Sequence, residues 1–190
     1  SCVWLGTGMS FGLCLLIALV GVQETLVERV VAVVGDQVIT LTEVEEAARV
    51  IWIAKGGNSK SVDSVPASVR DTVLDYLIDQ AVISQFVLRY GYEPSTKTQR
   101  DGYLRPFLDK FESRDAFEAF MRRFQIDEDD VIRLFERQTR NEAFIRERGR
   151  LRLLAAGSSV DSNALQSAMD DAFLEMKAQL KIRRSEVTGR

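Results

Sequence analysis

The chain has 190 residues, of which 46% are hydrophobic and 28% charged, a balance typical of a soluble globular protein. Its formal net charge of -3 gives no reason to expect nucleic acid as a partner. Histidine is absent, which removes the commonest general base and the commonest metal ligand. Both cysteines, Cys2 and Cys14, precede the first charged residue, Glu24, so we expect neither disulfides nor thiol chemistry after that point.

The start of the chain is uncharged, and Phe11–Val22 is a nearly unbroken apolar run. The run has the length of a signal-peptide core and is shorter than the roughly 20 residues that a membrane span needs. We therefore predict that residues 1–23 are a cleaved signal peptide, with an uncleaved N-terminal anchor as the alternative. The remaining chain, residues 24–190, is then exported.

A β-hairpin followed by a helix is predicted next. Two β-branched runs, Val30–Val34 and Val38–Thr40, flank a segment that begins Gly-Asp, and these residues tolerate the positive φ of tight hairpins. Thr42 lies three residues before Glu45, which is the spacing of a capping box at a helix start.

Two further helices follow a polar loop. The Gly/Ser-rich composition of Lys55–Val65 predicts a flexible loop. Apolar residues at helical spacing then predict a long central helix over Ala67–Tyr90. A third helix is expected from Ser95 to about Phe111, with a kink or a late start because Gly102 and Pro106 interrupt it.

The last part of the chain is predicted to end in a strand. Ser113 and Asp127 are expected to cap helices over Arg114–Phe124 and Glu128–Arg148. After a connector over residues 151–160, the spacing predicts a helix over Asp161–Gln179, and Leu180–Arg184 alternates like a strand. The predicted fold class is mainly α, a helical bundle with a small β-hairpin that the C-terminal strand joins to form a sheet.

Phenylalanines provide the candidate binding site. Six of them lie between positions 107 and 135, and most are expected to belong to the core. Short helices with an aromatic face close poorly over so much surface, so some of it is expected to form a groove for extended apolar peptides. The candidate peptide-binding residues are Phe107, Phe111, Phe117, Phe120, Met121 and Phe124.

Two clusters of charged residues could be functional sites, but a structural explanation is favoured for each. The acidic run Asp127–Asp130 contains enough carboxylates for a paired-acid hydrolase, but a helix start with its cap and dipole accounts for all four residues. Arginines between Arg137 and Arg152 would suit phosphate or anionic lipid, but interleaved glutamates cancel much of their field.

In this order of elements the chain resembles the N-terminal chaperone domain of the SurA family, which is related to the chaperone part of PpiD. The stretches that carry the resemblance are Val27–Glu46, Val73–Ser95, Phe111–Arg148 and Ala172–Arg184. The resemblance implies one SurA-like domain over residues 24–190, with an N-terminal part (24–150), the connector, and a C-terminal helix and strand (161–186). Members of the family usually carry parvulin prolyl-isomerase modules before the last stretch, and this chain lacks the length and the histidines for one.

The resemblance implies a non-enzymatic periplasmic chaperone. Its partners would be unfolded polypeptides, such as outer-membrane protein precursors, and no cofactor or metal would be needed. A degenerate prolyl isomerase and a structural or assembly subunit of an envelope complex are the alternatives. A homodimer and a membrane tether through residues 1–23 are left open as further associations.

Overall fold

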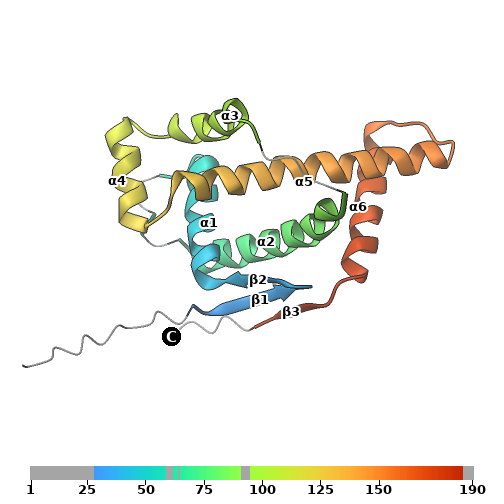
Figure 1. Ribbon diagram of the computed structural model, residues 1–190, viewed down its shortest axis with the longest axis horizontal. Helices are drawn as coiled ribbons and strands as arrows, with labels where there is room; N and C mark the ends of the chain where they lie inside the picture. Colours follow the sequence, from blue (N-terminus) through green and yellow to red (C-terminus); the bar gives the residue numbers. More distant parts are fainter. Residues whose placement is uncertain (1–27, 59–61, 64, 91–94, 186–190) are drawn as a thin grey trace, which may run out of the picture.

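The computed structural model describes residues 28–58, 62–63, 65–90 and 95–185. Predictions for residues 1–23 and for the middle of the Lys55–Val65 loop therefore lie outside the described residues. The elements follow the order β1, β2, α1, α2, η2, α3, α4, α5, α6 and β3, where η2 is a short 3₁₀ helix (Figure 1). This mainly helical structure with a small antiparallel sheet confirms the predicted fold class. None of the described helices combines the length and the hydropathy that a transmembrane span requires.

The sheet joins the two ends of the described chain. β1 (Val30–Val34) and β2 (Gln37–Thr40) form the predicted hairpin, and Gly35 in its turn has a φ of 60°. β3 (Ile182–Arg184) pairs antiparallel with the other side of β1, so that the strand order is β2-β1-β3. The prediction that the C-terminal strand joins the hairpin is therefore confirmed.

α1 (Leu41–Ala54) begins directly at the end of β2. Its N-cap is Thr40, whose backbone is extended and whose hydroxyl accepts a hydrogen bond from the Glu43 N–H at 3.2 Å. The prediction of Thr42 as the cap is wrong, because the helix starts two residues earlier and Thr42 already lies in its first turn. The cap position depends on where the preceding strand ends, which the capping pattern alone does not show.

α2 (Ala67–Val87) is the central helix, and η2 (Leu88–Tyr90) completes the segment predicted as a single helix. The helix lies between the sheet on one side and α5 on the other (Figure 1). It is buried on more than one face, which explains why residues as different as Leu77 and Gln80 are both inaccessible to solvent.

In Figure 1, α3 lies above α5 on the side away from the sheet, and α4 lies at the left end beside the start of α5. α3 (Lys97–Leu108) is continuous through Gly102 and Pro106, so a late start at these residues is wrong. Proline falls in the last turn, where it removes one hydrogen bond only, and the cap that begins the helix is Thr96 rather than Ser95. α4 (Arg114–Phe124) has the predicted bounds, and the Ser113 hydroxyl accepts from the Ala116 N–H at 3.1 Å.

α5 (Glu128–Ala155) continues well past the predicted end at Arg148, so the first half of the predicted connector is helical. The segment after Arg148 contains good helix formers, and the helix stops only where Gly157 adopts a φ of 65°. The Gly157 and Ser158 N–H groups then donate to the carbonyl oxygens of Leu154 and Leu153 at 3.1 and 3.0 Å, the pattern of a Schellman motif.

α6 (Ser162–Ala178) returns from the end of α5 to the body and leads into β3. The Asp161 carboxylate caps it by accepting from the Asn163 and Ala164 N–H groups. We call residues 144–178, the outer part of α5 with the loop and α6, the arm. Figure 1 shows the end of α5 projecting beyond α2 and the sheet. The remaining described residues form the body.

Candidate functional site

The predicted aromatic groove is a core. Phe107, Phe117, Phe120 and Met121 are buried, whereas Phe111 and Phe124 are half-buried. The expectation that this face forms an open groove is therefore wrong for the four buried side chains, because almost none of their surface is accessible. The two half-buried rings keep a part of their surface accessible.

The rings are buried because they pack on one another across three helices. Phe107 of α3 packs edge-on against Phe117 of α4 at a centroid distance of 6.2 Å and lies 6.1 Å from Phe135 of α5. Its ring is also 5.3 Å from Phe111, in another edge-on contact. Such edge-to-face contacts add to the free energy gained by burial. The short helices thus close over most of their aromatic face, so the expectation that these rings are mostly core fits the structure better than the expectation of a groove.

A charged pocket lies between α1 and α5. It has a volume of about 460 Å³, and its ionisable lining residues are Glu43, Glu46, Asp130, Arg133, Glu136, Arg137 and Arg140. Arg137 pairs with Glu43 at 3.3 Å, and Arg133 pairs with Asp130. Burial raises the pKa of Glu46, and the Asp130 carboxylate raises it further. Acids and bases therefore largely neutralise one another inside this pocket instead of presenting one charge to a ligand.

A second pocket, which we call the Trp52 pocket, has a different character. It has a volume of about 690 Å³ and lies between the end of α1, the turn that follows it and the first turns of α2. Its lining residues are Ile51, Trp52, Lys55, Gly56, Gly57, Asn58, Ser68, Val69, Thr72 and Val73. Lys55 is the only ionisable side chain among them. An apolar cavity with few polar groups is the usual form of a ligand pocket.

Gly57 leaves room for the indole ring that forms one wall of this pocket. A Cβ atom at position 57 would lie 2.2 Å from the Trp52 Nε1 and 2.3 Å from its Cδ1, so only glycine permits this contact. The Gly57 N–H also donates to the Trp52 carbonyl oxygen at 2.9 Å. The turn after α1 is therefore bonded to the backbone of Trp52, and its glycine leaves the space that the ring occupies.

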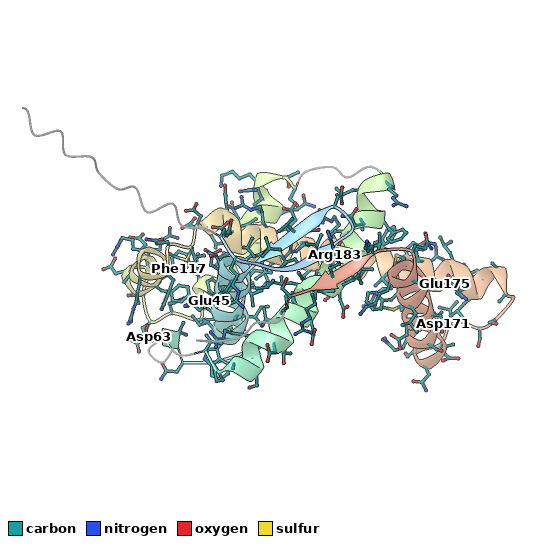
Figure 2. All side chains as sticks on the ribbon, turned by 90° about the horizontal axis from the view of Figure 1, so that it is seen from below. Glu45, Asp63, Phe117, Asp171, Glu175 and Arg183 are labelled. Carbon is teal, nitrogen blue, oxygen red and sulfur yellow. The ribbon has the colours of Figure 1, made fainter. Side chains whose placement is uncertain are left out.

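The arm carries most of the exposed large apolar side chains. Among the described residues, four of the seven that are exposed belong to the arm: Leu151, Leu154, Val160 and Leu174. Leu151 and Leu154 are each 52% exposed and, three residues apart on α5, share one face of the helix. Figure 2 shows Glu175 of the arm and Phe117 of the aromatic core on opposite sides of the molecule.

The arm is held together by a close helix contact. A Cβ atom at Gly149 would lie 2.8 Å from the Met169 Cγ and 3.1 Å from the Met169 backbone nitrogen. Arg152 of α5 pairs with Glu175 of α6 at 2.7 Å. Lys177 pairs with Asp79 of α2 at 3.0 Å and so joins α6 to the body.

The sequence did not point to the Trp52 pocket or to the arm. Leu151 and Leu154 were assigned to a connector, and a leucine in a loop carries no information about a helix face. Trp52 followed the apolar spacing of a helix, and nothing local indicates that the start of α2 forms the opposite wall. The pair Gly56-Gly57 after α1 is the only local signal, because glycine allows close approach to a ring.

No group of three or more acidic or cysteine side chains in the described part of the chain is arranged to hold a metal ion. No protein-family model matches the sequence, and no curated protein matches it either. The surfaces with a distinct chemical character are thus the arm, the Trp52 pocket and the charged pocket between α1 and α5.

Proposed function

We propose that this protein is a non-catalytic periplasmic chaperone that binds unfolded polypeptides and holds them on the arm. The observation that carries the proposal is the pair of leucines, Leu151 and Leu154, exposed on a helix that projects beyond the body. Apolar side chains in such a position have no role in the core of this chain. They offer surface to the apolar side chains of another polypeptide.

The architecture of the arm supports reversible binding. α6 covers one side of the outer part of α5 and leaves Leu151 and Leu154 on another, so a client gains apolar burial without any rearrangement of the body. A client that becomes ordered loses conformational entropy, which keeps the affinity modest. Modest affinity suits a protein that must later release what it holds.

The resemblance of the sequence to the SurA family supports the location and the kind of client. It favours the periplasm and precursors of outer-membrane proteins. Neither follows from the shape of the arm, which fits unfolded chains of many kinds.

The proposal is tested by suppression of aggregation. An unfolded β-barrel protein is diluted into buffer with equimolar purified chain, and light scattering follows its aggregation. The chain suppresses aggregation, and the double substitution Leu151→Ser with Leu154→Ser removes most of this effect. The matched control is Leu88→Ser, which changes a leucine that is 63% exposed but lies on η2, outside the arm.

Two results would contradict the proposal. One is the absence of any suppression at equimolar amounts. The other is a stable dimer, detected by size-exclusion chromatography with light scattering, together with arm substitutions that yield monomers but leave the suppression of aggregation unchanged. That second result would make the arm an interface between copies and would favour a structural subunit.

A further inference from the structure

The Trp52 pocket combines an apolar wall with a single positive charge. Trp52, Ile51 and Val69 are half-buried and Val73 is buried, so the pocket presents apolar surface that the fold does not cover. The indole packs directly against the Gly57 backbone, where no Cβ atom would fit. A preformed wall reduces the entropy that binding must overcome.

Lys55 gives the pocket its charge. It is exposed, and it is the only ionisable side chain among the residues that line the pocket. No acidic side chain is among the lining residues. The contrast with the pocket between α1 and α5 is direct, because there Arg137 already has Glu43 as a partner at 3.3 Å. In a chain of net charge -3, a lysine beside an apolar wall with no acidic lining residue favours a ligand that carries a carboxylate.

We propose that the Trp52 pocket binds one aromatic side chain of an unfolded polypeptide, and that Lys55 pairs with an acidic side chain next to it. This inference rests on the proposed function and makes it more specific, since it adds to the arm a site that selects particular segments. A ring suits the pocket because it packs against the indole edge-on or in an offset stack. The acidic neighbour remains in solvent at the rim, where Lys55 lies.

The two contacts are expected to contribute very different amounts. Burial of one phenylalanine side chain corresponds to roughly a ten- to hundredfold change in affinity. An exposed ion pair such as that of Lys55 corresponds to about a 1.4- to 5-fold change. The ring therefore determines binding, and the charge adjusts it.

The test uses Trp52 itself as the reporter. Trp4→Phe in the full chain leaves Trp52 as the only tryptophan, so its fluorescence reports on the pocket alone. The probe is a blocked peptide with one phenylalanine beside one glutamate in a Gly/Ser sequence. Three matched peptides replace the phenylalanine by alanine, the phenylalanine by leucine, or the glutamate by glutamine.

The phenylalanine peptide is expected to shift the Trp52 emission, with saturation. Replacement by alanine weakens binding by at least about tenfold, and replacement by leucine has a smaller effect. Replacement of glutamate by glutamine weakens it by up to about 5-fold, and this difference disappears at high salt. No emission change up to about 1 mM peptide, where even a weak site is half filled, would overturn the proposal.

Variants of the protein separate the two contacts. Lys55→Gln abolishes the preference for glutamate over glutamine and leaves the preference for phenylalanine over alanine. The matched control is Lys110→Gln, which removes an exposed lysine that lines none of the pockets described above and leaves both preferences intact. Gly57→Ala displaces the indole and weakens the phenylalanine peptide, while circular dichroism shows that the helices remain. An unchanged glutamate preference in Lys55→Gln would contradict the role of the lysine.

The aggregation assay distinguishes the pocket from the arm. If the peptides fail to bind but the chain still suppresses aggregation through Leu151 and Leu154, the pocket proposal is wrong and the proposed function stands. If the peptides bind but suppression fails, the pocket is a peptide site in a protein that is not a chaperone.

Discussion

α5 runs through two regions, the body and the arm, which differ in how much of their apolar side chains is exposed to solvent. In the body, it packs against the aromatic core, where Phe107 and Phe117 are each only 1% exposed. In the arm, Leu151 and Leu154 of the same helix are each 52% exposed. The body therefore gains stability from its apolar residues, whereas part of the apolar surface of the arm is available to another molecule. A continuous helix can thus combine a structural role with a binding role.

Asn141 marks the inner side of the boundary between the two regions. It is completely buried, and the two hydrogens of its Nδ2 are shared among three acceptors, the Gln80 carbonyl oxygen at 2.9 Å, the Gln80 Oε1 at 2.8 Å and the Ser84 Oγ at 3.0 Å. This network fixes α5 on α2 in one register. Beyond it, Gly149 brings α5 close to α6 instead.

The largest expected difference between body and arm is in the cost of removing a side chain. Phe107→Ala is expected to lower the free energy of unfolding by about 3–5 kcal/mol, because it leaves a cavity among packed rings. Leu154→Ala is expected to cost much less, about 0.5 kcal/mol, because about half of the surface of this residue is already exposed and no closed cavity forms. Urea denaturation of both variants measures the difference, and similar losses would show that the arm is not an independent surface.

The next effect concerns the attachment of α5 to the body. Asn141→Ala removes the donor to the buried Gln80 Oε1 and one of the contacts of the Ser84 Oγ, to which Arg140 also donates, and is expected to cost about 1–3 kcal/mol. Thr139→Ala, at an exposed position of the same helix, serves as the control. Hydrogen exchange is expected to show that Asn141→Ala exposes both α2 and α5. Exchange limited to the arm would contradict the role of the network.

A glycine in each region provides a comparison with identical chemistry. Gly102→Ala in α3 meets no atom within 4 Å and is expected to stabilise the protein by about 1 kcal/mol, the gain in helix propensity. Gly149→Ala has the same gain, but overpacking against Met169 costs about 1–3 kcal/mol. The second variant is therefore expected to be about 1–3 kcal/mol less stable relative to the first. Thermal unfolding measures both, and equal stabilisation would show that the arm tolerates separation of its helices.

The smallest effects depend on pH and have opposite signs in the two regions. Burial, with a further contribution from Asp130, raises the pKa of Glu46 in the body. A carboxyl group with a raised pKa stabilises the fold below its ordinary value of 4.5, and this contribution is lost as pH rises through the folded-state pKa. Glu46→Gln is therefore expected to increase stability at neutral pH, with a gain that disappears in acid.

On the arm, a hydrogen bond from Arg150 lowers the pKa of Glu147. Its contribution is present above the ordinary value and is lost as pH falls through the folded-state pKa. Glu147→Gln is therefore expected to decrease stability slightly at neutral pH and not in acid. Denaturation midpoints of both variants, measured at neutral and at acidic pH, check the two predicted signs. A gain in stability at neutral pH in both variants would contradict the prediction for Glu147.

Local signals predicted much of the fold. The hairpin followed from two β-branched runs around Gly35, and α4 followed from the Ser113 cap, because each signal lies next to the structure it determines. The end of α5 was missed because no residue between Arg148 and Ala155 requires either continuation or termination. That the C-terminal strand joins the hairpin was expected from the resemblance and from its alternating pattern, whereas its pairing with β1 and the register became visible only in the structure.

The candidate sites were less predictable than the fold. Whether Phe117 is buried depends on how α4 packs on α3, which depends on contacts between segments that are separate in sequence. The Trp52 pocket has walls from the end of one helix and the start of the next. Aromatic content indicated where apolar area is concentrated, but only the packing shows which part of that area the fold leaves open.

The position of β3 has a consequence for the order in which the protein folds. Ala32 near the start of the described chain pairs with Arg184 near its end, so the sheet cannot be completed until nearly the whole chain is available. A pairing of such long sequence separation forms late, because the loop must close before the strand contacts can form. While the chain is being synthesised, one edge of β1 therefore has unsatisfied backbone groups, which is where a nascent molecule is most prone to pair with another.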